Sequence, residues 1–160
     1  MIFTLKDYLA IRDSINDLVF TNGCFDIIHR GHVEYLNQAK SLGKYLLVGL
    51  NSDESVRKIK GEGRPINIEA DRAFVLSNLK CVDAVIVFNE DTPYNLIKAV
   101  RPDILVKGGD WKEDKIVGSD VVKNYGGKVY SLKYIDSYST SNIIDKIKKD
   151  WVRLSSDNKK

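Results

Sequence analysis

The two histidines of the chain, His29 and His32, stand three residues apart with Gly31 between them. They follow a short apolar run and open a long amphipathic stretch, so the pattern predicts a strand, a turn and a helix start. A helix start favours an anion through its free N–H groups and dipole, and Gly31 lets a phosphate approach the backbone closely. The residues therefore predict a phosphate site with two imidazoles as hydrogen-bond donors.

Two other uses of these residues stay open. The histidines can cap the helix or pack against its neighbours, and Asp26, His29 and His32 have a spacing that also suits a metal site. A catalytic zinc site fixes three ligands in a defined geometry, and Gly31 interrupts the stretch, so the phosphate interpretation is preferred. Asp26 fits either of two tasks, orienting a histidine or the incoming phosphate, or capping the turn.

Apolar runs rich in Val, Ile and Leu recur along the chain with amphipathic stretches between them, which is typical of parallel strands joined by crossover helices. Strands are predicted at 17–21, 45–51, 84–88, 104–107 and 128–132, and helices at 5–14, 31–42, 68–79, 92–100, 119–125 and 141–151. The predicted class is α/β, a Rossmann-like open sheet of about five parallel strands with helices on both faces.

Composition and length bound the remaining possibilities. The 160 residues suit one domain, predicted at 1–154 with a polar tail at 155–160. A net charge of +3, with both signs interleaved, predicts no nucleic-acid partner. Cys24 and Cys81 fit neither a disulfide framework nor a zinc motif, and the sequence shows no signal peptide and no apolar run that could span a bilayer. A cytoplasmic location without membrane contact is expected.

Ligands of an open parallel sheet bind beyond the carboxyl ends of its strands, so the residues after each strand are the candidates for chemistry. Lys107 ends a buried run and precedes two glycines, which favours a phosphate contact. Ser139, Thr140 and Ser141 lie at the start of the last predicted helix and can both cap it and bind the β- and γ-phosphates of a nucleotide. Residues 51–67 lack a clear period and are a candidate active-site loop.

The motif His29-Arg30-Gly31-His32 resembles that of the HxGH nucleotidyltransferases of the cytidylyltransferase-like superfamily. Stretches spread over most of the chain are similar to the branch that makes ADP-heptose from heptose 1-phosphate. They are 21–26, 51–53, 63–67, 103–110 and 139–144. Cys24 and Tyr134 depart from the residues common in glycerol-phosphate cytidylyltransferases and argue against that branch.

The resemblance implies transfer of AMP from ATP to a sugar 1-phosphate, D-glycero-D-manno-heptose 1-phosphate in the matching branch, with release of pyrophosphate and with Mg²⁺ on the triphosphate. The implied catalytic residues are His29, His32 and Lys107. The implied nucleotide-binding residues are Thr21, Asn22, Gly23, Cys24, Phe25, Gly31, Asn51, Arg72, Ser139, Thr140 and Ser141. The implied substrate-binding residues are Asp26, Asp53, Arg64, Gly108 and Asp110. For Arg72, a solvated position on a helix is the alternative.

The expected partners are ATP and the sugar phosphate. A homodimer or higher homo-oligomer is expected because the family is commonly oligomeric and residues 1–14 carry apolar side chains that need cover. The similar bifunctional enzymes carry a sugar-kinase domain for which 160 residues leave no room, so a separate kinase is expected. Two alternative functions remain, a cytidylyltransferase acting on glycerol 3-phosphate or another small phosphorylated acceptor, and a non-catalytic nucleotide-binding protein.

Overall fold

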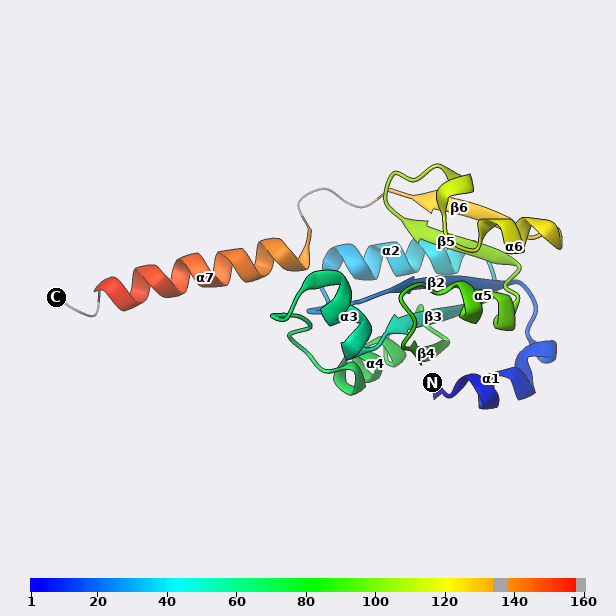
Figure 1. Ribbon diagram of the computed structural model, residues 1–160, viewed down its shortest axis with the longest axis horizontal. Coiled ribbons are helices and arrows are strands. Elements are labelled where there is room, and N and C mark those ends of the chain that lie inside the picture. The colour runs from blue at the N-terminus through cyan, green and yellow to red at the C-terminus, as the bar shows by residue number, and fades with distance from the viewer. Residues whose placement is uncertain (134–137, 158–160) are drawn as a thin grey trace.

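A single parallel sheet of six strands organises the chain in the computed structural model, which describes residues 1–133 and 138–157, with side chains described as far as Trp151. The strand order is β1-β4-β3-β2-β5-β6 (Figure 1). The strands are β1 (Ile2–Phe3), β2 (Leu18–Gly23), β3 (Tyr45–Asn51), β4 (Ala84–Phe88), β5 (Ile104–Gly108) and β6 (Lys128–Leu132). The predicted α/β class and parallel sheet are confirmed, with one strand more than expected.

Helices cover both faces of this sheet because successive side chains of each strand point to opposite faces. In β2, Leu18 and Phe20 belong to one apolar core and Val19 belongs to the other. The first core packs α1 (Leu5–Ile11), α5 (Tyr94–Val100) and α6 (Ser119–Asn124), and the second packs α2 (Arg30–Ser41) and α4 (Glu69–Ser77). Two further helices are α3 (Asp53–Lys60) and α7 (Thr140–Asp157), and short 3₁₀ turns lie at Arg12–Ser14 and Glu113–Lys115.

Two elements were not predicted. β1 is only two residues long and pairs with the edge of β4. α3 occupies the first half of the stretch that was interpreted as a loop, and it begins where the Ser52 hydroxyl accepts a hydrogen bond from the Ser55 amide. It ends at Gly61, whose φ of 94° stops the helix. The candidate active-site loop therefore shrinks to the residues between α3 and α4.

The chain reverses its winding direction between β2 and β5, which are the adjacent first and fourth strands of the five-strand core. β2 pairs with β3 from Leu18 to Gly23, but its pairing with β5 covers only Val19 with Ile104 and Phe20 with Leu105. Beyond Phe20 the two strands are therefore no longer paired at their carboxyl ends. In doubly wound sheets this switch point is where ligands bind.

α7 starts beside the carboxyl end of the sheet and extends away from the body of the protein (Figure 1). The helix runs to Asp157, past the predicted end at residue 151, so the first residues of the predicted tail are helical. Residues 158–160 and Tyr134 lie outside the described residues. Within the part of the chain that the structure describes, no helix is long and apolar enough to cross a bilayer.

Candidate functional site

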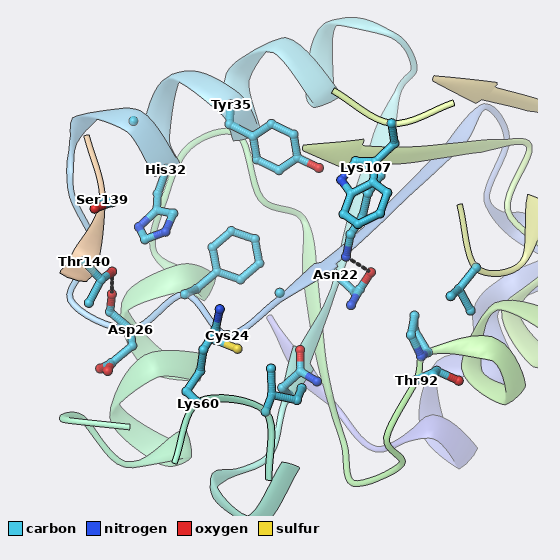
Figure 2. Close-up of a pocket in the computed structure, with 18 of the residues that line it drawn as sticks. Asn22, Cys24, Asp26, His32, Tyr35, Lys60, Thr92, Lys107, Ser139 and Thr140 are labelled. Carbon is cyan, nitrogen blue, oxygen red and sulfur yellow. Dashed lines mark hydrogen bonds between the residues drawn. The ribbon is translucent and has the colours of Figure 1, made fainter. Parts of the chain in front are cut away.

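A cavity of about 650 Å³ lies at the carboxyl ends of β2 and β5 and contains most of the predicted site residues. Those that line it are Asn22, Gly23, Cys24, Phe25, Asp26, His29, Gly31, His32, Asn51, Arg64, Lys107, Ser139, Thr140 and Ser141. Figure 2 shows how some of them converge: Cys24, Asp26 and His32 from the β2–α2 turn and the start of α2, Lys107 from β5, and Ser139 and Thr140 from the start of α7. A cavity of this size is in the range of small-molecule sites.

The histidine pair sits at the first turn of α2. His29 is the extended residue before the helix, with φ −138°, and His32 lies within the first turn. Their rings stack with centroids 3.8 Å apart and planes inclined by 19°, and the Phe25 ring meets His32 edge-on at 5.4 Å. Gly31 is required here, because a Cβ at this position would lie 2.8 Å from the Cβ of Tyr138.

The histidine rings have hydrogen-bonding capacity that no described residue uses. Both ring nitrogens of His29 and Nδ1 of His32 are buried without a hydrogen-bond partner among the described residues. Buried polar atoms are normally bonded, so such atoms at the wall of a cavity indicate a ligand. Burial lowers the pKa of His29, and burial together with the neighbouring His29 lowers the pKa of His32 to about 4. Both imidazoles are therefore neutral near pH 7 when the cavity holds no anion.

We expect His32 to make the protein less stable in mild acid. The unfolded chain takes up the His32 proton near pH 6.5 and the folded chain only near pH 4, so the unfolded state holds more protons between these values. The free energy of unfolding therefore falls as the pH drops through this window, by on the order of 3 kcal/mol at most. Urea titrations of the wild type and of His32→Gln from pH 7 to pH 4 measure this, and the variant should show the flatter curve. Parallel curves would contradict the expectation.

Lys107 extends from β5 into the cavity, where its ammonium donates a hydrogen bond to the Asn22 side-chain oxygen at 3.2 Å (Figure 2). Burial, with a smaller contribution from the nearby Lys60, lowers the pKa of Lys107. Lys60 lines the same cavity from the last turn of α3 and was missed because residues 51–67 were not expected to form a helix. Two ammonium groups beside two histidines make this cavity suited to a polyanion.

The start of α7 closes the cavity on the side of the histidines. The Ser139 hydroxyl accepts a hydrogen bond from the Asn142 amide at 3.0 Å and so caps the helix. The Thr140 hydroxyl donates to the backbone oxygen of Asp26 at 2.6 Å, and the Tyr138 ring stacks on His29 at 6.3 Å. An 18-residue helix therefore directs its positive end at the cavity that the histidines line.

Asp26 lies in the same turn but does not present its carboxylate to the cavity. The side chain is fully buried, and its two oxygens accept hydrogen bonds from the Arg64 side chain and the amides of Ile66 and Asn67 at 2.8 to 3.0 Å. Burial alone would raise the pKa of Asp26, but these hydrogen bonds and the Arg64 charge outweigh it and lower the pKa. The carboxylate of Asp26 is thus bonded to the loop after α3. The substrate contact that the resemblance implied for Asp26 does not fit these bonds, whereas the expected alternatives, orienting a histidine or capping the turn, need no contact with the substrate.

Arg72 and Asp53 also differ from expectation. Arg72 was expected to reach the triphosphate, with a solvated position as the alternative, but its side chain is 1% exposed and lies outside the cavity lining. It donates to the backbone oxygens of Asn67 and Cys24 at 2.9 and 2.6 Å and to Asp53 at 2.7 Å. Arg72 thus joins α4, α3 and the β2–α2 turn from behind the cavity. The Asp53 carboxylate, predicted to bind substrate, is held in this ion pair.

The geometry agrees with the comparison to known families. The model of the cytidylyltransferase-like family matches residues 20–156, a span that includes the histidine pair, Lys107 and the start of α7. The chain belongs to the cytidylyltransferase-like family. The resemblance inferred from the His29–His32 motif is thereby confirmed.

Relatives within this family narrow the comparison. The chain is 56% identical over 130 residues to the "Bifunctional protein HldE" of Geobacter metallireducens, covering 81% of this chain and 26% of the relative. It is 57% identical to the protein of the same name from Wolinella succinogenes, covering 81% and 27%. The chain thus spans about a quarter of the length of these curated relatives. The solved lipopolysaccharide core biosynthesis protein of Thermoplasma volcanium is 33% identical, with a TM-score of 0.61, and the match covers 76% of this chain and 98% of that one.

Besides Arg72 and Asp53, three more predicted site residues of this cytidylyltransferase-like chain, Thr21, Gly108 and Asp110, lie outside the cavity lining. Thr21 is fully buried and shares a hydrogen bond with the Tyr35 hydroxyl. The Gly108 oxygen accepts a hydrogen bond from the Trp111 indole at 3.1 Å, and Asp110 is exposed beside it. Cys24 does line the cavity, but burial raises the pKa of its thiol, so it is not poised as a thiolate nucleophile.

The far wall of the cavity was largely missed by the sequence analysis. It comes from the segments after β4 and β5, which carry Asp91, Thr92, Pro93, Trp111, Lys115, Ile116 and Val117. Further unpredicted lining residues are Tyr35, Ile59, Leu105 and Tyr138. These residues could have been found from their positions directly after β4 and β5, because ligands of an open parallel sheet bind beyond the carboxyl ends of its strands.

Proposed function

We propose that this chain transfers AMP from ATP to the phosphate of D-glycero-D-manno-heptose 1-phosphate in the cytoplasm, forming ADP-heptose and pyrophosphate. The observation that carries the proposal is the pair of neutral, stacked histidines beside Lys107 and the start of α7, whose buried ring nitrogens find no hydrogen-bond partner in the described part of the chain. Family membership supports the reaction class, and the relatives of 56% and 57% identity support the heptose branch.

The chain's residues position two anions and stabilise the charge that moves between them. An oxygen of the sugar phosphate forms a bond to the α-phosphorus of ATP as the bond from that phosphorus to the bridging oxygen breaks, and pyrophosphate leaves with the electron pair. His29 and His32 donate hydrogen bonds to oxygens that gain charge in this step. Ser139, Thr140 and Ser141 hold the outer phosphates at the positive end of α7.

Mg²⁺ accompanies ATP in this proposal. Among the described residues there is no group of three or more His, Cys, Asp or Glu side chains that could hold a metal ion. The hydroxyl oxygens at the start of α7 fit a cation that is held mainly by phosphate oxygens and water, which is the usual preference of Mg²⁺. When bound, the cation neutralises charge on the triphosphate.

Substitution of Lys107 tests whether this residue binds a phosphorylated substrate before the reaction begins. We expect Lys107→Ala to raise the apparent KM for a phosphorylated substrate by roughly 10- to 100-fold with little change in kcat, because a charge-assisted hydrogen bond complete before the reaction contributes to binding alone. Steady-state kinetics with each substrate varied in turn measures this. Lys128→Ala, an exposed lysine at the start of β6, is the control. A fall in kcat with unchanged KM would place Lys107 in the transition state instead.

The function itself is tested by a substrate panel. ATP and CTP are each combined with heptose 1-phosphate, glycerol 3-phosphate and phosphoethanolamine, and pyrophosphate release is followed. We expect release with ATP and heptose 1-phosphate. Release with CTP and glycerol 3-phosphate would instead support the cytidylyltransferase alternative, and ATP binding without release from any pair would support the non-catalytic one. The homo-oligomer and the separate sugar kinase stay predictions.

A further inference from the structure

Asp26 occupies a strained point of the β2–α2 turn. The residues on either side of it, Phe25 and Ile27, have φ angles of 45° and 49°, in the left-handed region that side chains with a Cβ rarely adopt. Such conformations persist only where the surrounding structure determines them, and they cluster at functional sites. The contacts of Asp26, which lies between these two residues, are therefore candidates for the interactions that stabilise this turn.

Those contacts reach two other segments of the cavity wall. The carboxylate accepts hydrogen bonds from Arg64, Ile66 and Asn67, which belong to the loop between α3 and α4. The backbone oxygen accepts the hydrogen bond of Thr140 at the start of α7 (Figure 2). One residue, three positions before His29, is thus bonded to the loop that carries Arg64 and to the helix start that carries the hydroxyls.

Asp26 also supplies a negative charge that acts on the histidine pair. Its charge acts to raise the pKa of His32, against the larger lowering by burial and by His29. Among the described residues, the other charged or titratable groups around the histidines are Arg64, which is paired with Asp26, and Arg30, which is paired with Glu34 and lies against the Tyr138 ring beside His29. Cys24, Lys60 and Lys107 line the same cavity. The negative charge of Asp26 raises the pKa of His32, and so does a bound phosphate, so together they favour the protonated ring when substrate is bound.

A direct role in the reaction does not fit these contacts. The Asp26 side chain has no exposed surface, and both oxygens are already bonded to donors of the protein. A carboxylate in this state can neither accept a proton from the substrate nor coordinate it without breaking the loop away. Asp26 must therefore influence the reaction indirectly, through the positions of the residues to which it is hydrogen-bonded.

We propose that Asp26 is a positioning residue, which fixes the histidine turn, the Arg64 loop and the first turn of α7 relative to one another and so presents His32 to the α-phosphate. The proposal rests on the proposed function for what His32 does. The position of the His32 ring and its pKa do not depend on which sugar phosphate the enzyme uses, so both can be measured without that substrate.

The test compares Asp26→Asn with the wild type in three measurements. An amide cannot accept all three hydrogen bonds and carries no charge, so we expect kcat to fall roughly 10- to 100-fold, as for small misplacements of catalytic groups. We also expect the His32 titration, followed by the ¹⁵N shifts of the two histidines, to move to lower pH. Binding of a non-hydrolysable ATP analogue, measured by calorimetry, should weaken much less than kcat falls.

Two further variants separate positioning from simple destabilisation. Asp83→Asn is the matched control, because Asp83 also accepts a backbone amide, Leu46 at 2.7 Å, and a cation, Lys40, but at the opposite edge of the sheet. It should lower the melting temperature and leave the histidine titration and kcat unchanged. Arg64→Gln removes the cation that offsets Asp26, so the His32 titration should move to higher pH, opposite to Asp26→Asn.

Two results would contradict the proposed positioning role of Asp26. If Asp26→Asn lowers only the melting temperature, with kcat within twofold of the wild type and an unchanged His32 titration, the proposal is wrong. If Asp26→Asn does not fold, an unchanged His32 titration in Arg64→Gln overturns it equally. Because the titrations and the analogue binding need no sugar phosphate, they stand even if the substrate panel returns a different acceptor.

Discussion

Replacing His29 or His32 with alanine is expected to lower kcat about a hundredfold or more while the affinity for ATP changes far less. A donor aimed at oxygens that gain charge only as pyrophosphate departs stabilises the transition state more than the bound substrate, so its loss appears in turnover. Removal of one such donor typically costs about 3 kcal/mol. The structural basis for this expectation is the set of buried ring nitrogens at the cavity wall that no residue described by the structure contacts through a hydrogen bond.

Steady-state kinetics gives kcat, and calorimetry of ATP binding gives the affinity. Because the two rings stack at 3.8 Å, the double variant should lose less than the sum of the single losses. Gln38→Ala, on the exposed outer side of the same helix, is the matched control and should leave both quantities unchanged. Near-normal turnover in both histidine variants would remove the phosphate-site interpretation and favour the non-catalytic alternative.

Arg72→Met is expected to destabilise the protein by about 3 to 5 kcal/mol, the range for breaking a buried ion pair from one side. The substitution leaves the Asp53 carboxylate and the backbone oxygens of Asn67 and Cys24 without the donors that now satisfy them. Methionine fills much of the space, so the loss arises from these orphaned acceptors more than from a cavity.

Denaturant unfolding followed by circular dichroism measures the change. Arg57→Met, an exposed arginine on α3, is the control and should change the free energy of unfolding by less than about 0.5 kcal/mol. The residual activity of folded Arg72→Met discriminates the two interpretations of this residue. A large loss of ATP affinity with intact stability would restore the triphosphate contact that the sequence suggested.

The sheet and the histidine motif could be predicted because each rests on local pattern. Strands buried on both faces appear as continuous apolar runs, and the predicted bounds of β3, β4 and β6 match the structure. β1 could not be found this way, since two residues carry no period and its pairing depends on β4, more than eighty residues away. α3 has few buried apolar residues, but its Ser52 cap, acidic first turn and basic last turn were a usable signal.

The burial and the contacts of Asp26 and Arg72 could not be predicted, for a different reason. A charged residue in a sequence is expected at the surface, and whether it is buried depends on partners distant along the chain. Asp26 is held by residues 38 to 41 positions away, and Arg72 by Cys24, 48 positions away. Resemblance to a family locates such residues near a site but does not say whether they face the ligand or support the wall behind it.

The short pairing between β2 and β5 divides the sheet unevenly. β3 holds β2 along its whole length, whereas β5 holds it at two residue pairs only, so the β5–β6 edge is joined to the rest by the shortest ladder inside the core. The cavity spans this seam, with His29 and His32 on one side and Lys107 on the other. A triphosphate that contacts residues on both sides stabilises the paired arrangement of β2 and β5, because it binds only when the two strands are held together. Amide hydrogens of β5 should therefore exchange more slowly when ATP is bound, while those of β3 barely change.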